Sequence, residues 1–100
     1  IMDGSGGIRM AWWVYMLRCR DGSLYTGVTT DVNRRFAQHL DGTGARYTRS
    51  HPPEAVVYRE ELPDKSAALR RESAIKRLPR AKKLRLLSPA GEAPAEREEP

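Results

Sequence analysis

The sequence predicts an α+β fold, in which a small three-stranded antiparallel sheet is flanked by helices as in an α/β sandwich. Two patterns predict it: three short β-rich runs, and three segments of helical character, each with a helix start signal. Their order along the chain is β-β-α-β-α-α. Hydrophobic residues make up 39% and charged residues 31% of the 100 residues, which is typical of a folded domain rather than a disordered chain.

The three strands come from runs rich in aromatic and β-branched residues. Residues 11–20 (AWWVYMLRCR) form the first, and residues 24–29 (LYTGVT) form the second. Asp21-Gly22 lies between them and is a strong hairpin signal. Residues 55–60 (AVVYRE) form the third strand. We therefore expect a hairpin followed by a strand that returns after a helix.

The first helix follows the hairpin directly. Thr30 or Asp31 caps its start, and the segment DVNRRFAQHLDG ends near Gly42. Residues 42–53 (GTGARYTRSHPP) are predicted to be a loop, because glycine, serine and proline punctuate them.

Two further helices follow the third strand. Asp64 or Ser66 caps the second helix, which runs to about Leu78. Pro79 interrupts it and suits the first turn of a short last helix, residues 80–87.

The ends of the chain differ in composition from its middle. Residues 1–9 are glycine-rich and aperiodic, so they are interpreted as an added leader before a native start at Met10. Residues 88–100 are rich in Pro, Ala and Glu, and are predicted to be a disordered acidic tail. The working domain is residues 10–87.

Charge is distributed unevenly and favours a polyanionic partner. The whole chain carries a formal charge of +5, but residues 10–87 carry 16 Lys or Arg against 8 Asp or Glu. No apolar run reaches membrane-spanning length, so no membrane association is expected. A single cysteine, Cys19, cannot form an internal disulfide or a zinc cage; it is interpreted as a packed strand residue in a cytoplasmic protein.

The first helix places two candidate site residues together. Val32, Phe36 and Leu40 fall on one apolar stripe, while Arg35 and His39 are four residues apart along its edge. A guanidinium beside an imidazole suits a phosphate. A partly buried structural role for His39 is the alternative.

Glu72 is the only acidic residue between Lys65 and Gly91. On a helix it lies at the margin of the apolar face, where its carboxylate suits a hard divalent cation while basic neighbours hold phosphates. The alternative is an internal salt bridge to Arg71 or Lys76.

Taken together, these residues resemble the GIY-YIG nuclease superfamily, and most closely its small stand-alone bacterial members. The two signature elements stand as Trp13-Val14-Tyr15 and Tyr25-Thr26-Gly27. Further shared runs are DGSLYTGVTTD, RRFAQH, GTGARYTR, VVYRE and RRESAIKRL. The resemblance covers roughly residues 11–87.

The resemblance implies metal-dependent hydrolysis of a nucleic-acid phosphodiester with one Mg²⁺ or Mn²⁺ ion and no small-molecule cofactor. If the roles of the family's site residues apply at the matching positions, Glu72 holds the metal and Arg35 binds the scissile phosphate. Tyr15 and Tyr25 flank the attacking water. Tyr15 is favoured as general base, with help from His39, once metal and Arg35 charges lower its pKa. Gly27 lets the backbone approach the site.

A shared site requires both tyrosines on one sheet face. We therefore predict a three-residue hairpin loop, Asp21-Gly22-Ser23, with a bulge, because a strict two-residue loop would place Tyr15 and Tyr25 on opposite faces.

Basic residues outside the catalytic set are candidate nucleic-acid contacts. In the loop of residues 42–53, Arg46 and Arg49 alternate with Tyr47, a pattern that suits a backbone or an unstacked base; a packed loop anchored by Tyr47 is the alternative. The remaining candidates lie on the two last helices: Lys76, Arg77, Arg80, Lys82 and Lys83.

The resulting expectation is an endonuclease of low sequence selectivity, acting on DNA rather than RNA, in repair or recombination, and a monomer by default. A catalytically silent nucleic-acid-binding module on the same scaffold is the first alternative. A domain whose basic face meets an acidic protein is the second.

Overall fold

The computed structural model describes residues 11–87, so the predictions for residues 1–9 and 88–100 lie outside the described residues. It confirms the α+β class and the three-stranded antiparallel sheet. The elements in chain order are β1 (Trp12–Cys19), β2 (Leu24–Thr29), α2 (Val32–Leu40), α3 (Arg46–Ser50), β3 (Pro53–Leu62), α4 (Lys65–Lys76) and α5 (Arg80–Leu87).

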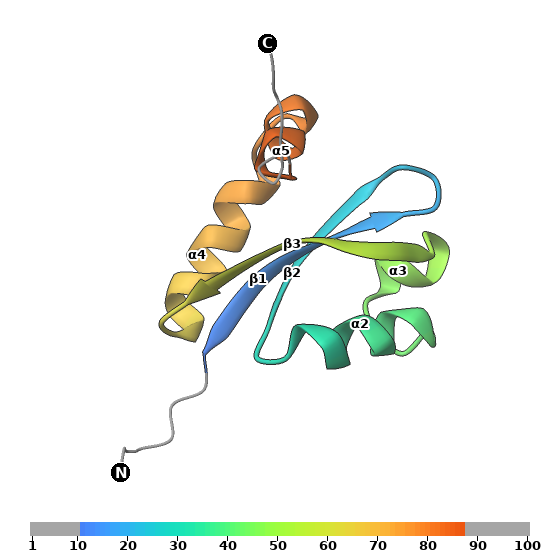
Figure 1. Ribbon diagram of the computed structural model, residues 1–100, viewed down its shortest axis with the longest axis horizontal. Coiled ribbons are helices and arrows are strands. Elements are labelled where there is room, and N and C mark those ends of the chain that lie inside the picture. The colour runs from blue at the N-terminus through green and yellow to red at the C-terminus, as the bar shows by residue number, and fades with distance from the viewer. Residues whose placement is uncertain (1–10, 88–100) are drawn as a thin grey trace.

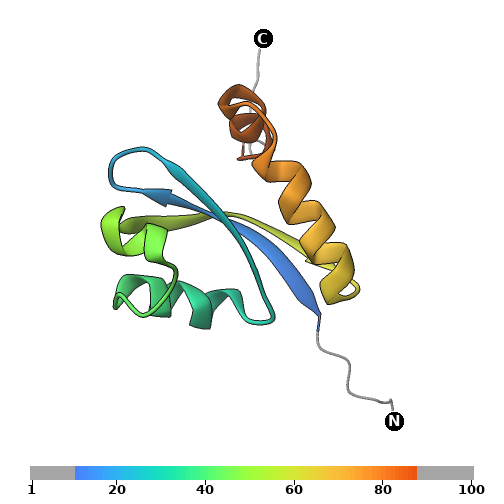
Figure 2. The same ribbon diagram turned by 180° about the vertical axis from the view of Figure 1, so that it is seen from behind.

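Helices cover both faces of the sheet, whose strand order is β2-β1-β3. Helices α4 and α5 lie on one side and α2 and α3 on the other, as Figures 1 and 2 show. Central strand β1 therefore buries both sets of alternating side chains. Val14 and Met16 pack toward α4 and α5, whereas Tyr15 and Leu17 pack toward α2.

The β1–β2 hairpin has the predicted loop length but not the predicted loop residues. Leu17 pairs with Tyr25 and Tyr15 with Gly27, so the two tyrosines share a face, as predicted. The loop is Arg20-Asp21-Gly22 rather than Asp21-Gly22-Ser23, since the Cys19 amide donates to the Ser23 carbonyl at 2.9 Å. Gly22 takes φ +88°, a conformation suited to glycine. The loop therefore ends at Gly22, one residue earlier than predicted.

Helix caps follow from the aspartates. The Asp31 carboxylate accepts the Arg34 amide at 3.0 Å, and the Asp64 carboxylate accepts the Ala67 amide at 2.8 Å. Helix α4 ends at Lys76, two residues before the predicted end. Along α2, Leu40 is not part of the buried stripe: it is 57% exposed, and the buried face runs through His39 instead.

The segment predicted to be a loop contains a short helix, α3, so that prediction was wrong in part. Its five residues are too few for a hydrophobic period to be visible in sequence. The turn is held locally, because the Thr48 hydroxyl donates to the Ala45 carbonyl at 2.9 Å and the His51 amide donates to the Tyr47 carbonyl at 2.9 Å.

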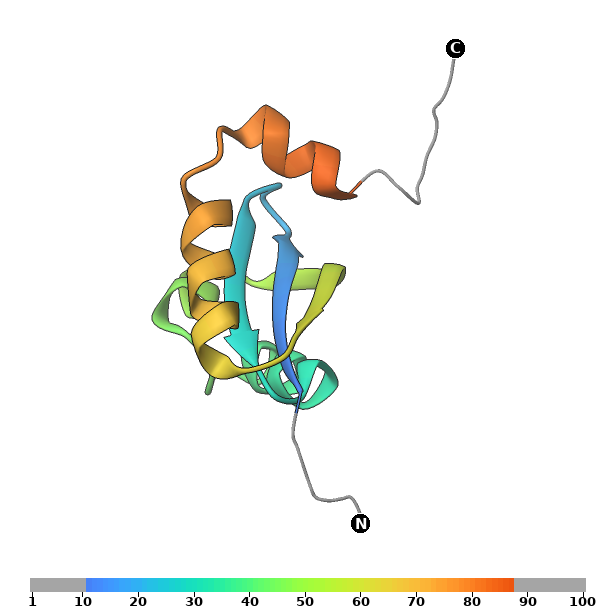
Figure 3. The same cartoon turned by 90° about the vertical axis from the view of Figure 1, so that its left-hand side faces the viewer.

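Helix α5 turns back over the hairpin end of the sheet, as the edge-on view shows (Figure 3). Leu86 and Leu87 pack against the cluster that contains Met16 and Ile75. The Arg80 guanidinium donates to the Gly22 carbonyl at 2.8 Å, which ties α5 to the hairpin loop. No helix within residues 11–87 is long and apolar enough to cross a membrane.

Candidate active site

The site is built around the Tyr15 side chain, which is 1% exposed on the central strand. Its ring lies across Gly27 of the neighbouring edge strand β2. A Cβ atom at position 27 would come within 2.6 Å of the Tyr15 hydroxyl oxygen and 2.8 Å of Cζ. Gly27 is therefore required by the close approach of this ring, which gives a physical reason for the glycine of the second signature element.

Tyr15 is paired with His39 across the interior. The Tyr15 hydroxyl and His39 Nε2 are 2.8 Å apart, and the imidazole is 1% exposed. Tyr25 completes the group, with ring centroids 6.3 Å from Tyr15 and 5.2 Å from His39. Three predicted site residues from β1, β2 and α2 are thus in contact.

A second hydrogen bond anchors the far side of the imidazole. His39 Nδ1 lies 2.7 Å from the Thr48 hydroxyl of α3, and Thr48 is 2% exposed. Gly44 brings the loop close: a Cβ there would be 2.5 Å from His39 Nδ1. Gly44 and Thr48 were missed as individual site residues, because a small residue and a hydroxyl in a loop carry no catalytic signal of their own.

Arg35 joins the group from the same helix as His39. Its guanidinium donates to the Gln38 side chain at 2.9 Å and lies near enough to the Tyr15 hydroxyl to exert a lowering effect on its pKa. Beside it lies a hollow of about 290 Å³. Arg34 is exposed and also borders this hollow, whose other lining residues are Trp12, Val28, Thr29, Thr30, Asp31, Arg35 and Gln38.

Glu72 approaches the site from the other sheet face. Helix α4 packs against both β1 and edge strand β2, and the Glu72 carboxylate is close enough to raise the pKa of Tyr15 by its charge. Its side chain is 18% exposed and forms an ion pair with Lys76 at 3.1 Å. The alternative read from the sequence is thus present with Lys76, whereas Arg71 pairs with Glu60 at 2.9 Å.

Burial sets the protonation states of the central pair. It raises the pKa of Tyr15 to about 12, with a further contribution from Tyr25, and this outweighs the lowering effect of Arg35. Burial, followed by the Arg35 charge, lowers the pKa of His39. With these residues alone the tyrosine pKa therefore moves opposite to the direction its expected role required, and a neutral tyrosine faces a neutral imidazole at pH 7.

Aromatic rings continue from the site to the surface. Tyr47 lies over Tyr25 with centroids 5.8 Å apart, and His51 stacks on Tyr47 at 4.0 Å and 5°. Tyr47 is 36% exposed, and its neighbours Arg46 and Arg49 are exposed. The packed-loop alternative accounts for Tyr47, while the two arginines remain accessible to a polyanion.

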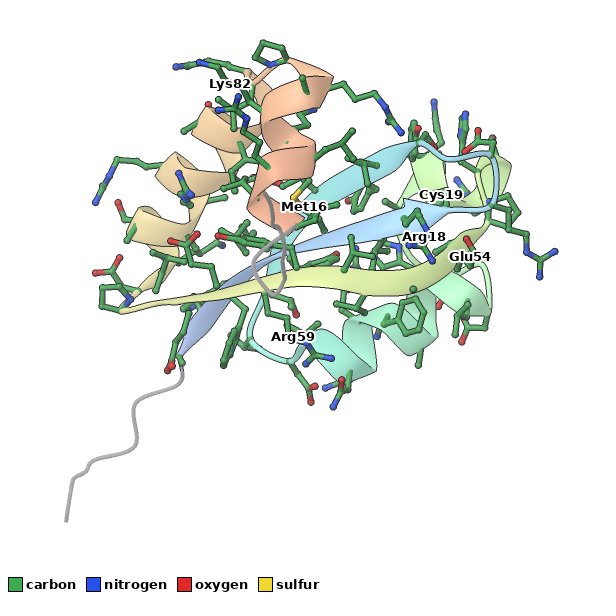
Figure 4. The ribbon with its side chains drawn as sticks, turned by 45° about the horizontal axis from the view of Figure 1, so that its top comes forward. Met16, Arg18, Cys19, Glu54, Arg59 and Lys82 are labelled. Atoms are coloured by element: carbon green, nitrogen blue, oxygen red, sulfur yellow. The ribbon has the colours of Figure 1, made fainter. Side chains whose placement is uncertain are left out.

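The other candidate nucleic-acid contacts lie on α4 and α5. Arg77, Arg80 and Lys82 are exposed and Lys83 is half-buried. Figure 4 shows Lys82 on α5, on the opposite side of the sheet from Arg59, whose guanidinium donates to the Asn33 side chain of α2 at 3.0 Å. Met16 lies between the sheet and these last helices.

The donors suit a hard cation, with one protein ligand. Within residues 11–87 there is no group of three or more His, Cys, Asp or Glu side chains that could hold a metal. Glu72 is a half-buried carboxylate whose charge acts on Tyr15, and Mg²⁺ is commonly bound by one or two carboxylates with substrate phosphate and water. The site therefore fits a single ion whose remaining ligands come from outside the protein.

A hairpin with an antiparallel third strand carries the Tyr-Tyr-His-Arg group beside one glutamate, which is the arrangement that the sequence resemblance implied. The family model for the GIY-YIG catalytic domain matches residues 11–85, so the chain belongs to the GIY-YIG nuclease superfamily, whose substrates are nucleic acids.

Its similar proteins are small members of this superfamily. The chain is 55% identical over 73 residues to a UPF0213 protein of Xanthomonas axonopodis pv. citri, covering 73% of this chain and 72% of the relative. The solution structure of the UPF0213 protein BH0048 from Bacillus halodurans has a TM-score of 0.53 at 48% identity, over 82% of this chain and 87% of that one. The solution structure of EF2693 from E. faecalis has a TM-score of 0.54 at 38% identity, over 75% and 80%.

Proposed function

We propose that this protein is a divalent-metal-dependent endonuclease that hydrolyses phosphodiester bonds, with DNA preferred over RNA and little sequence selectivity. The observation that carries the proposal is the buried hydrogen bond of 2.8 Å between Tyr15 and His39, beside the Arg35 guanidinium and within reach of the Glu72 charge. This group offers a proton acceptor, a phosphate ligand and a metal ligand around one hydroxyl.

In the proposed reaction, a water oxygen bonds to phosphorus while the opposite P–O bond breaks. The Tyr15 hydroxyl takes the proton of that water and passes its own proton to His39 Nε2. The leaving oxygen takes a proton from solvent, and His39 later returns its proton to solvent. This relay removes the need for a tyrosinate, which the pKa of about 12 makes scarce at pH 7.

Stabilisation of the negative charge on the phosphate would come from Arg35 and from the metal ion that Glu72 would hold. Arg35 lies at the Tyr15 hydroxyl and can bind the non-bridging oxygens of the attacked phosphate. Glu72 would hold the single Mg²⁺ or Mn²⁺ ion, which when bound supplies positive charge to the phosphate. Lys76, freed from its ion pair, is then available to the nucleic-acid backbone.

The test is a panel of branched, flapped, single-stranded and duplex DNA and RNA substrates, each assayed with Mg²⁺, Mn²⁺ and chelator. Cleavage that requires metal and is lost in both Glu72→Gln and Arg35→Gln supports the proposal. The matched control is Arg18→Gln, which removes an exposed guanidinium that pairs with Glu54 on the sheet face opposite Tyr15 and should leave cleavage unchanged. Undiminished cleavage by purified Glu72→Gln would show that the metal assignment is wrong.

A catalytically silent nucleic-acid-binding module is the second candidate. The Glu72–Lys76 ion pair favours it, since the carboxylate is already neutralised by a lysine. It predicts salt-sensitive binding, no cleavage with any metal, and the same affinity in Glu72→Gln. The substrate panel separates the two candidates.

A further inference from the structure

The loop after α2 is shaped around the His39 ring. Gly44 lies so close to Nδ1 that no side chain fits, and the Thr48 side chain comes from the following helix α3. The Ala45 carbonyl lies 2.9 Å from the Thr48 hydroxyl. Residues 44–48 therefore surround one edge of an imidazole whose other edge meets Tyr15.

The donors and acceptors around His39 determine where the protons of this group lie. A carbonyl can only accept, so the single Thr48 hydroxyl proton points to Ala45. Toward His39, at 2.7 Å, the hydroxyl must then accept, which places the imidazole proton on Nδ1. A neutral imidazole with Nδ1–H has a bare Nε2, which accepts the Tyr15 proton at 2.8 Å. The donors run in one direction, from Tyr15 through His39 and Thr48 to the Ala45 carbonyl.

The opposite proton arrangement satisfies fewer groups. If the Thr48 hydroxyl donated to Nδ1, its 2.9 Å contact with the Ala45 carbonyl would contain no hydrogen. Nε2 would then carry the proton, and the Tyr15 hydroxyl would accept from His39 instead of donating to it. The Ala45 amide also points at Nδ1, but at 3.5 Å it is at the outer limit for a hydrogen bond and weaker than the 2.7 Å contact.

We propose that Thr48 is a positioning residue that holds His39 in its Nδ1–H tautomer and so keeps Nε2 free to accept the Tyr15 proton. Thr48 touches no reacting atom and acts through His39. Its catalytic consequence depends on the proposed nuclease function, while the tautomer itself does not. Threonine suits this position because its hydroxyl can accept one hydrogen bond while it donates another. The Thr48 residue is 2% exposed.

The variants are Thr48→Val, which keeps the shape and removes the hydroxyl, and Thr48→Ser, which keeps the hydroxyl. Protein labelled with ¹⁵N at the imidazole reports the His39 tautomer by long-range ¹H–¹⁵N spectra at pH 7. We expect Nδ1–H in the wild type and in Thr48→Ser, and loss of that tautomer in Thr48→Val. The full amide spectrum checks that each variant folds.

Turnover gives the second measurement, on the best substrate of the panel. We expect Thr48→Val to lower kcat about ten- to a hundredfold, as for loss of a hydrogen-bond partner behind a functional histidine, with KM unchanged and activity restored in Thr48→Ser. A bare Nδ1 in the wild type, or an unchanged tautomer in Thr48→Val, overturns the proposal. So does unchanged kcat in a Thr48→Val protein that has lost the tautomer.

The two proposals fail in different ways. A wild-type protein without cleavage on any substrate, but with the Nδ1–H tautomer that Thr48→Val abolishes, contradicts the nuclease proposal and supports the tautomer assignment. Should Thr48→Val not fold, the wild-type and Thr48→Ser spectra decide alone: Nδ1–H in both supports the assignment, and Nε2–H in either overturns it.

Discussion

Close packing around two polar side chains dominates at the scale of single residues. Gly27 makes room for the Tyr15 ring and Gly44 makes room for the His39 ring, from opposite ends of one hydrogen-bonded pair. Both rings are almost fully buried, so neither can move away cheaply. The packing around Tyr15 and His39 therefore requires glycine at positions 27 and 44.

Gly27→Ala should damage the site without removing a polar group. The added methyl would meet the Tyr15 hydroxyl oxygen at 2.6 Å, and Tyr15 is held by His39. We expect a loss of about 1–3 kcal/mol in the free energy of unfolding, measured by urea denaturation, as for overpacked cores. In the double variant with Tyr15→Phe the nearest clashing atom is gone, so the two losses should be less than additive. Strict additivity, or a wild-type stability in Gly27→Ala, would contradict this.

His39 should make stability depend on pH. Burial and the Arg35 charge lower its pKa from the ordinary value of 6.5, so the unfolded chain binds a proton more readily than the folded protein. The stabilising contribution is complete above about pH 6.5 and is lost as pH falls through the folded pKa.

We therefore expect the melting temperature to fall from pH 7 toward pH 5, and this fall to be shallower in His39→Gln. The carboxyls of Asp21 and Asp41 do not interfere, because hydrogen bonds from Ser23 and Thr43 hold their pKa values below 3.8. An equal pH dependence in the two proteins would refute the burial effect at His39.

Within single elements, the spacing of α4 couples the proposed metal ligand, Glu72, to a basic neighbour, Lys76. Glu72 and Lys76 are one turn apart and form an ion pair of 3.1 Å at the half-buried edge of the helix. A cation at Glu72 must displace Lys76 or share the carboxylate with it. The helix thus holds the site in a charge-balanced state before substrate arrives.

Lys76→Met should strengthen divalent-ion binding. The change keeps the apolar stem and removes the competing charge, and an exposed helical pair contributes about 0.3–0.5 kcal/mol. We expect roughly a twofold lower half-saturating Mn²⁺ concentration, measured by water proton relaxation. Lys82→Met on α5 is the matched control and should bind Mn²⁺ as the wild type does. Weaker binding by Lys76→Met would show that Lys76 does not compete for this carboxylate.

The element level also shows what sequence can predict. The strands and the capped helices followed from local rules, since turns, caps and two-residue alternation act over few residues. The shared face of Tyr15 and Tyr25 was predicted instead from the need for one common site, and the register confirms it. Helix α3 was missed because five residues carry no period. The exposed Leu40 was mispredicted because a polar residue, His39, occupies the buried position and finds its partners in β1 and α3.

The sequence named the residues of the candidate site, but it did not reveal their protonation states. The helix pattern and the family resemblance named Tyr15, Arg35, His39 and Glu72, which interact in the structure through a hydrogen bond and through charge. The protonation of the pair could not be inferred, because it depends on burial created by the whole fold.

Considered as a whole, the molecule has two unlike sheet edges. Edge strand β2 carries Tyr25 and Gly27 and is contacted by α4, so residues from both sheet faces meet there. Edge strand β3 lies on the other side of β1, where Arg59 is engaged by Asn33. We therefore expect a bound phosphate at the β2 edge, with the nucleic acid extending from there over the sheet face that carries α4 and α5.

This placement predicts a directional pattern of salt dependence. Each lysine or arginine that contacts a phosphate contributes close to one unit to the slope of log K against log salt concentration. Arg77→Gln and Lys83→Gln, on the α4–α5 side, should each reduce that slope by about one and weaken binding across all sequences, measured by fluorescence anisotropy. Arg59→Gln makes the same charge change at the β3 edge and should alter neither affinity nor slope. Equal effects from the three variants would mean that nucleic acid is attracted by net charge alone, with no preferred path across the β2 edge.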